Sequence, residues 1–177
     1  MGIQIGAKPD SGFEDPIGML TDCHRRIEHF LNILCVVVER ALERKLSEEE
    51  TAAVQTALQY FRVGGERHTE DEEESLFPRL RDRVGGTAFD EIGSLEDDHQ
   101  AAYGLHRQVE TLYLKWISDG VLNEDENRQL VSSTEQLKSL YTEHIKIEEQ
   151  IVFPRAAQSL DSAAIRAIGQ EFRKRRA

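Results

Sequence analysis

Hydrophobic residues recur along four stretches of the chain at alternating intervals of three and four, which is the spacing of one face of an α-helix. The stripes run from Ile17 to Ala41, Val54 to Glu72, Ile92 to Trp116 and Leu130 to Glu148. Helix-start signals precede three of them: Asp15-Pro16, Ser47 with Glu50, and Asn123 with Glu126. The pattern therefore predicts four long helices, and Asp161 is placed to cap a fifth, shorter one.

Helices joined by short connections pack antiparallel with their neighbours, because a short loop cannot carry the chain back to the far end. We therefore predict an all-α fold, an up-down-up-down antiparallel four-helix bundle with a short C-terminal helix. Residues 1–14 are expected to form a flexible arm, 15–160 the bundle, and 161–177 a terminal helix packed on the bundle or trailing from it. The second helix is expected to bend or end near Pro78, with the next turn at Gly85-Gly86.

Histidines occupy positions inside the apolar stripes, one in each predicted long helix: His24, His68, His99 and His144. In an antiparallel hairpin, residues at the same height are equidistant from the turn. The three successive pairs then require turns near residues 46, 83–84 and 121–122, and each position lies beside a predicted helix start or turn. The sequence therefore predicts that the four histidines share one level of the bundle.

The sequence around the second of these histidines repeats around the fourth. Residues 68–78 read HTEDEEESLFP and residues 144–154 read HIKIEEQIVFP, and the two align without a gap. In each copy a glutamate, Glu72 or Glu148, stands four residues after the histidine, one helical turn along the same face. The repeat predicts two halves related by a pseudo-twofold axis through a shared site.

Imidazoles and carboxylates in a bundle interior are costly to bury, by several kcal/mol for each charged group that has no partner. A bound metal removes that penalty. Imidazole with carboxylate and no thiolate is the ligand set of iron or manganese rather than of a closed tetrahedral zinc site. The expected arrangement gives each of two metals two histidines, with Glu72 and Glu148 bridging the pair. Positions then remain for a small ligand such as O₂, NO or peroxide.

These motifs resemble the haemerythrin (HHE cation-binding) domain family from about residue 15 to the end of the chain. The resemblance rests on His24, on His68-x-x-x-Glu72-Glu73 before Leu-Phe-Pro, on His99, and on His144-x-x-x-Glu148-Glu149 before Val-Phe-Pro. It implies an up-down bundle that holds two iron ions in an oxo- or hydroxo-bridged centre, with these four histidines and with Glu72 and Glu148 as the ligands. Single histidines on helices one and three are most similar to the di-iron domain of proteins that repair iron–sulfur centres.

Two tyrosines lie near the predicted metal level. Oxygen-carrying members of the family have a second histidine four residues along the third helix, whereas this chain has Tyr103 four residues after His99. Tyr141 stands three residues before His144, on the inner face. Each is either a packed aromatic with a hydrogen-bonded hydroxyl or a group that contacts an oxygen ligand of the metals. We carry Tyr103 and Tyr141 forward as candidate cofactor-binding residues.

Other polar positions have plainer interpretations. His106 lies roughly 10 Å along its helix from the metal level and is expected to be structural, and His29 is expected to face solvent. Glu28, one turn from the first of the four histidines, is an additional candidate ligand. We expect solvent exposure for the acidic residues of the run 70–74 other than Glu72, and for the basic residues 173–176.

Acidic residues outnumber basic ones by 33 to 22, which gives a net charge of −11. Such a field repels nucleic acid and anionic membranes, and we expect neither as a partner. Cys23 and Cys35 are twelve residues apart on one predicted helix, roughly 18 Å and beyond disulfide reach. Cys23 is expected to pack as a small apolar residue. Reduced thiols and a start without an apolar signal segment lead us to expect a cytoplasmic protein.

The sequence therefore predicts a non-haem di-iron protein that binds or senses O₂, NO or peroxide. The alternative is a stress-response role, in which the iron pair reduces NO or peroxide, takes part in iron–sulfur cluster repair, or donates iron. A ferritin-like oxidase would need Glu-x-x-His on two helices, and only Glu96-x-x-His99 fits. Whether the protein is an enzyme stays open at this stage.

Overall fold

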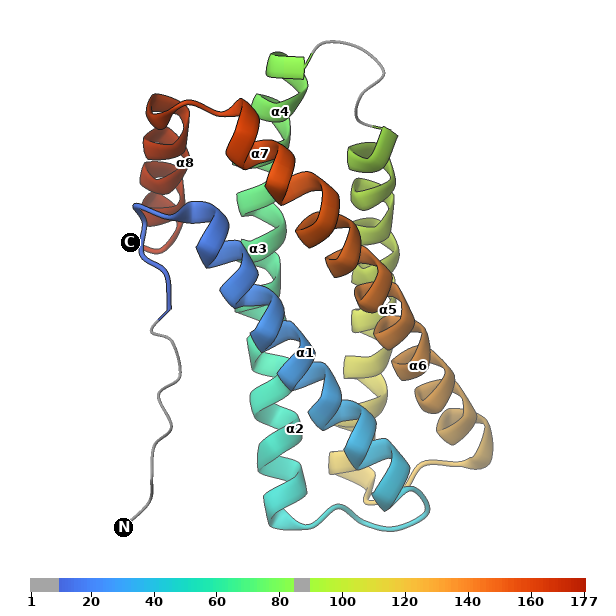
Figure 1. Ribbon diagram of the computed structural model, residues 1–177. Helices are drawn as coiled ribbons and strands as arrows, with labels where there is room; N and C mark the ends of the chain where they lie inside the picture. The colour runs from blue at the N-terminus through green and yellow to red at the C-terminus, as the bar shows by residue number, and fades with distance from the viewer. Residues whose placement is uncertain (1–9, 85–89) are drawn as a thin grey trace, which may run out of the picture.

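The computed structural model describes residues 10–84 and 90–177, and these residues form helices and connecting segments without any β-strand. Four long helical stretches run alternately down and up the molecule, and a shorter helix follows them at the C-terminal end (Figure 1). The predicted all-α bundle with a short C-terminal helix is confirmed.

Two of the long helices are uninterrupted, and two contain π-helical turns, which are wider than an α-helical turn. The uninterrupted ones are α1 (Pro16–Ala41) and α5 (Asp90–Asp119). The second long helix comprises α2 (Glu48–Tyr60), the π turn η1 (Phe61–Gly65), α3 (Glu66–Asp71), the π turn η2 (Glu72–Leu76) and α4 (Phe77–Val84). The fourth comprises α6 (Glu124–Ile147), the π turn η3 (Glu148–Val152) and α7 (Phe153–Ser159). The terminal helix is α8 (Ser162–Arg175).

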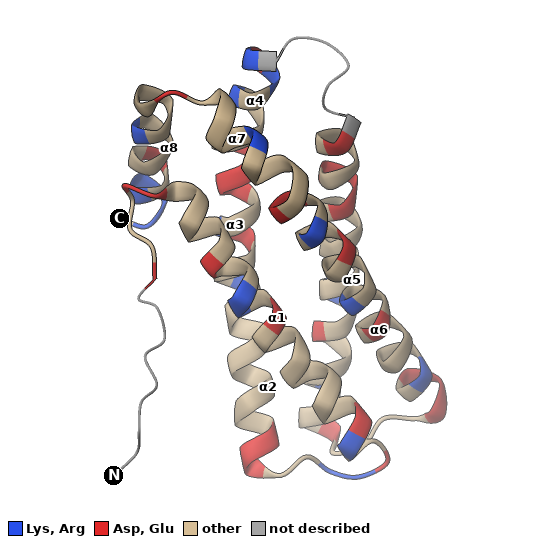
Figure 2. Cartoon of the chain, viewed as in Figure 1, with Lys and Arg blue, Asp and Glu red and all other residues tan. Residues whose placement is uncertain are grey.

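The predicted helix starts are confirmed by hydrogen bonds between backbone and capping side chains. At α2, the Glu50 amide donates to Ser47 Oγ at 3.1 Å, and the Ser47 amide donates to the Glu50 carboxylate at 2.8 Å. Asn123 and Glu126 make the same reciprocal pair at α6, at 2.9 and 3.0 Å. These bonds satisfy amides that the first turn of a helix leaves without partners. In Figure 2 both starts are also marked by acidic residues, which the positive end of the helix dipole favours.

The second long helix continues past Pro78 to Val84, so it does not end at this proline. The π turn η2 comes directly before the segment that contains Pro78, and η3 comes directly before the segment that contains Pro154. Proline lacks an amide hydrogen and crowds the preceding turn, and a wider turn at that point accommodates it without ending the helix. The predicted turn at Gly85-Gly86 lies outside the described residues.

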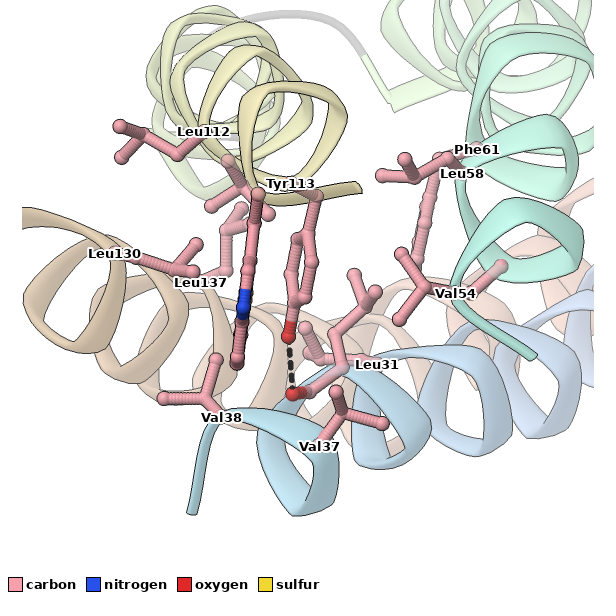
Figure 3. Close-up of a cluster of buried hydrophobic side chains, with 14 of the residues drawn as sticks. Leu31, Val37, Val38, Val54, Leu58, Phe61, Leu112, Tyr113, Leu130 and Leu137 are labelled. Atoms are coloured by element: carbon pink, nitrogen blue, oxygen red, sulfur yellow. Dashed lines mark hydrogen bonds between the residues drawn. The ribbon is translucent and has the colours of Figure 1, made fainter. Parts of the chain in front are cut away.

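Buried apolar side chains form two clusters on either side of the histidine level. One cluster includes Leu20, Leu76, Leu95 and Val152, and the other includes Ile27, Phe61, Ala102 and Leu137. Along each long helix the histidine lies between members of the two. Figure 3 shows part of the second cluster, in which the Tyr113 hydroxyl donates to the Leu34 carbonyl at 2.6 Å. The polar level is therefore enclosed from both ends of the bundle by apolar side chains.

Part of the predicted flexible arm is docked on the bundle. The Ser11 amide donates to the carboxylate of Asp22 on α1 at 2.5 Å. The backbone of Phe13 lies against Gly169 of α8 so closely that a Cβ there would meet the Phe13 carbonyl oxygen at 1.9 Å. Only glycine fits at that crossing. Residues 1–9 lie outside the part of the chain that the structure describes.

Ion pairs hold the end of α8 against the second long helix. The Arg175 and Arg176 guanidinium groups lie 2.8 and 2.6 Å from the carboxylate of Asp71, whose side chain is fully buried. The expectation that these three residues are solvated was therefore wrong. Within residues 10–84 and 90–177, no helix is both long and apolar enough to cross a membrane.

Candidate metal centre

The structure brings the six predicted ligands together at one level of the bundle. Their residues are buried, from 0% relative exposure for the two glutamates to 8% for His99. Ligand atoms lie within 4.8 Å of one another in two groups: His24, His68, Glu72 and Glu148, and Glu72, His99, His144 and Glu148. We call these six residues the metal layer. Both groups contain both glutamates.

Each glutamate in the metal layer directs its two oxygens towards different histidine pairs. Oε2 of Glu148 lies 3.0 Å from Nε2 of His24, and Oε1 lies 3.2 Å from Nε2 of His144. Oε1 of Glu72 lies 3.5 Å from Nε2 of His68, and Oε2 lies 3.4 Å from Nε2 of His99. This is the arrangement of a carboxylate that bridges two ions.

Buried polar atoms in the metal layer lack hydrogen-bond partners among the described residues. They are His24 Nε2, His68 Nδ1, His99 Nε2 and all four carboxylate oxygens of Glu72 and Glu148. The short nitrogen–oxygen contacts above do not have hydrogen-bond geometry at these atoms. Leaving so many polar atoms unsatisfied in an apolar interior costs roughly 1–3 kcal/mol each. A metal pair satisfies the atoms that face the layer, so the residues present fit such a group.

The two buried carboxylates do not ionise alike. Burial raises the pKa of Glu72 well above its usual range, and the nearby carboxylate of Glu148 raises it further. Burial also opposes ionisation of Glu148, but the close imidazoles of His144 and His24 hold the pKa of Glu148 well below its usual range. A bound cation would offset both effects, because it favours the charged form of Glu72.

Two of the imidazoles, those of His68 and His99, are held towards the neutral form that binds metals. Burial lowers the pKa of His68 well below its usual range, and the neighbouring imidazole of His24 lowers it further. Burial and the neighbouring His144 also lower the pKa of His99. His144 differs, because the carboxylates of Glu148 and Asp98 raise its pKa in spite of burial. A metal ion competes with that proton, so metal binding here is expected to release protons.

Carboxylates outside the metal layer fix three of the imidazoles from behind. Nδ1 of His24 donates to Glu149 at 2.9 Å, Nδ1 of His99 donates to Glu73 at 2.7 Å, and Nδ1 of His144 donates to Asp98 at 3.3 Å. A carboxylate only accepts, so each bond keeps the proton on Nδ1 and leaves the Nε2 lone pair facing the layer. We call Glu73, Asp98 and Glu149 the outer carboxylates.

The outer carboxylates were missed at the sequence level, and the expectation that Glu73 is solvated was wrong. A signal for two of them was present, because a second glutamate follows the ligand glutamate in both copies of the repeat. The π turns η2 and η3 begin at the ligand glutamates themselves, Glu72 and Glu148. In these turns Glu73 reaches His99 on α5, and Glu149 reaches His24 on α1. Such turns are frequent at functional sites.

Comparison with known families agrees with this geometry. A family model described as the Hemerythrin HHE cation binding domain matches residues 15–167, most of the chain and the whole metal layer. The chain belongs to the haemerythrin family. No curated protein matches it in a sequence comparison. The cation binding in the family description and the two ligand groups together identify a haemerythrin-like metal-binding protein.

A groove of about 530 Å³ leads to the haemerythrin-like metal layer along the side of the bundle. It is lined by residues of α2, η1, α3, α5 and α6, including Phe61, Gly65 and Ala102, and it reaches His99 of the metal layer. The volume is in the range of small-molecule sites. The groove therefore has room for a small molecule beside His99.

A hydrogen-bonded pair, His106 and Tyr141, forms part of the groove wall, with 2.9 Å between Nε2 and the hydroxyl. Burial lowers the pKa of His106 to about 4 and raises the pKa of Tyr141, so both are neutral near pH 7. The ring centre of Tyr141 lies 6.4 Å from that of His144, so this tyrosine is adjacent to the metal layer. The role of Tyr141 as a contact for a bound ligand stays a prediction.

Tyr103 and Glu28 do not join the metal layer. Tyr103 is 55% exposed, and the guanidinium of Arg107 lies 5.9 Å from its ring centre. The inner position is taken by Ala102, which is three residues after His99 and buried, so a residue four along points outwards. Tyr103 also lines the groove that reaches His99, so its contact with a small ligand of the metals stays a prediction. Glu28 is also exposed.

Proposed function

We propose that this chain holds two iron ions in the metal layer and binds or senses O₂, NO or peroxide there. The observation that carries the proposal is the bridging arrangement of Glu72 and Glu148, each with one oxygen towards each histidine pair. Two ions, each with two imidazoles and a share of both carboxylates, engage every unsatisfied atom that faces the layer.

The donor atoms favour iron. Imidazole with carboxylate is the usual ligand set of non-haem iron sites with open positions. Thiolate is not a donor here, because Cys23, although buried beside His24, accepts a hydrogen bond from Arg26 at 3.3 Å and belongs to neither ligand group. Four protein ligands for each ion leave positions free for a small ligand.

When bound, the iron pair supplies electrons and open coordination positions for a diatomic or peroxide ligand. The chain itself supplies the surroundings. Two apolar clusters exclude bulk water along the bundle axis, and the groove beside His99 admits a small molecule. The outer carboxylates keep the imidazole lone pairs directed inwards. We assign to Tyr141 a polar contact with the small ligand from the groove wall.

The binding role is tested by rapid mixing of anaerobic, ferrous-iron-loaded protein with NO, O₂ or hydrogen peroxide. We expect one reversible complex per iron pair. Repeated turnover would instead support NO or peroxide reduction, and release of iron into solution would support iron donation in cluster repair. Either result contradicts a dedicated binding or sensing role.

The proposed contact of Tyr141 is tested by two variants, Tyr141→Phe and Thr56→Val, each of which removes one hydroxyl. One net hydrogen bond is worth about 0.5–1.5 kcal/mol, so Tyr141→Phe is expected to speed ligand dissociation roughly 3- to 10-fold. Thr56→Val is the control, because that side chain is exposed and does not line the groove, and it should leave the rate unchanged. Equal rates for wild type and Tyr141→Phe would remove Tyr141 from the account.

A further inference from the structure

The two histidine pairs of the metal layer are not equivalently supported. Behind His99 and His144, both Nδ1 atoms donate to outer carboxylates, at 2.7 Å to Glu73 and 3.3 Å to Asp98. Behind the other pair, only one Nδ1 does so, from His24 to Glu149.

Nδ1 of His68 is buried and has no hydrogen-bond partner in the described part of the chain. The pseudo-twofold repeat explains the difference. It relates His68 to His144 and His24 to His99, so the position equivalent to Asp98, directly before His99, is Cys23, directly before His24. The Cys23 sulfur accepts from Arg26 and is not bonded to His68. One half of the repeat thus lacks a carboxylate that the other half has.

We infer that the two metal positions differ in affinity, and that the ion held by His99 and His144 is bound more tightly than the ion held by His24 and His68. A carboxylate that accepts from the far nitrogen of a metal-ligating histidine fixes the ring and raises the basicity of the ligating nitrogen. Loss of such a partner typically costs about 10- to 100-fold in metal affinity. Asp98 is then the positioning residue that sets the difference.

The inference rests on the proposed iron pair, and its consequence is stepwise release. On treatment with a chromophoric ferrous chelator under anaerobic conditions, the ion at His24 and His68 leaves first. The ion at His99 and His144 leaves in a second phase, at a chelator concentration about 10- to 100-fold higher.

Symmetry-related glutamates provide a matched test. Glu73 and Glu149 occupy equivalent places in the two copies of the repeat and are similarly exposed, at 31% and 41%. Glu73→Gln weakens the tighter position, so the two phases should approach each other. Glu149→Gln weakens the looser position, so they should move further apart, or the first ion should be missing from the purified protein. Asp98→Asn should act like Glu73→Gln.

The decisive readout is the separation of the two release phases. A general loss of stability would not decrease this separation in one variant and increase it in the other. Equal shifts in the same direction for Glu73→Gln and Glu149→Gln overturn the inference. Wild-type protein that holds two irons and releases them in one phase also overturns it, while the proposed iron pair stands. Wild-type protein that holds fewer than two irons overturns both.

Discussion

The contact between α8 and Asp71 gives a prediction whose magnitude follows from burial. The carboxylate of Asp71 is fully buried and is held by two guanidinium groups, at 2.8 Å from Arg175 and 2.6 Å from Arg176. The arginine side chains keep 16% and 22% of their surface exposed. Loss of the ion pairs therefore leaves the buried carboxylate without counter-charge, whereas the arginine side chains can still be solvated.

Replacing both arginines, Arg175→Gln with Arg176→Gln, leaves a buried carboxylate without counter-charge. Such a change costs roughly 3–5 kcal/mol. Asp71→Asn removes the charge instead and leaves guanidiniums that still reach water, and Arg175 keeps its 2.8 Å bond to Ser75 Oγ. We expect a cost of about 1 kcal/mol, the net value of a typical hydrogen bond. The double arginine replacement is therefore expected to destabilise the protein more than Asp71→Asn does.

Equilibrium urea unfolding at fixed metal concentration measures both changes. For a chain of this length, 3–5 kcal/mol also corresponds to a fall in melting temperature of roughly 6–20 °C. The control removes the same two charges from the exposed neighbours, Arg173→Gln with Lys174→Gln, and should cost about 1 kcal/mol or less. An equal destabilisation by Asp71→Asn or by this control would show that the buried charge of Asp71 does not set the cost of losing Arg175 and Arg176.

Three further predictions follow from single sites. Burial holds the pKa of His106 at about 4, below its ordinary 6.5. Between these two pH values the unfolded chain binds a proton that the native chain does not, so stability falls as pH drops from about 6.5 to about 4. His106→Gln should reduce this loss of stability by about 3 kcal/mol at most, as measured by urea unfolding at pH 7 and pH 4.5. An unchanged pH dependence in the variant would show that His106 does not cause the loss. Hydrogen bonds from Arg44 and from the Ser47 amide lower the pKa of Glu50 to about 2. The stabilisation that Glu50 gives to the folded state is therefore present above about pH 4.5 and lost towards pH 2. Glu50→Ala should cost about 1 kcal/mol of unfolding free energy at pH 7 and less near pH 2. An equal cost at both pH values would contradict the capping role. Gly65→Leu should narrow the groove and slow ligand entry in rapid mixing. Gly65→Ala should not, because its Cβ meets Phe61 at an ordinary 3.6 Å. Equal entry rates for the two variants would exclude the groove as the route.

The metal layer was predictable because its register follows from periodicity. His24, His68, His99 and His144 lie in stripes that the core itself requires, and the turns between them are marked by capping residues. Antiparallel packing of successive helices then places the four histidines at one level, and the structure brings them together there. The exposure of Tyr103 was not anticipated by the same method, because spacing alone does not say on which side of His99 the core lies.

The surroundings of the layer were less predictable. Glu73 reaches His99 from a π turn, and regular α-helical periodicity does not anticipate where such a turn begins. Asp71 pairs with residues more than one hundred positions away, on a helix whose docking side the sequence does not specify. Both contacts depend on tertiary packing, and both involve charged residues that sequence patterns assign to solvent by default.

Metal analysis of protein expressed in iron-rich medium decides whether the layer holds two iron ions. Two irons per chain are expected. Glu72→Ala is expected to lose both ions, because that carboxylate serves both histidine pairs, whereas the exposed His29→Ala keeps two. One zinc per chain, or an iron content that Glu72→Ala leaves unchanged, would contradict the proposed iron pair.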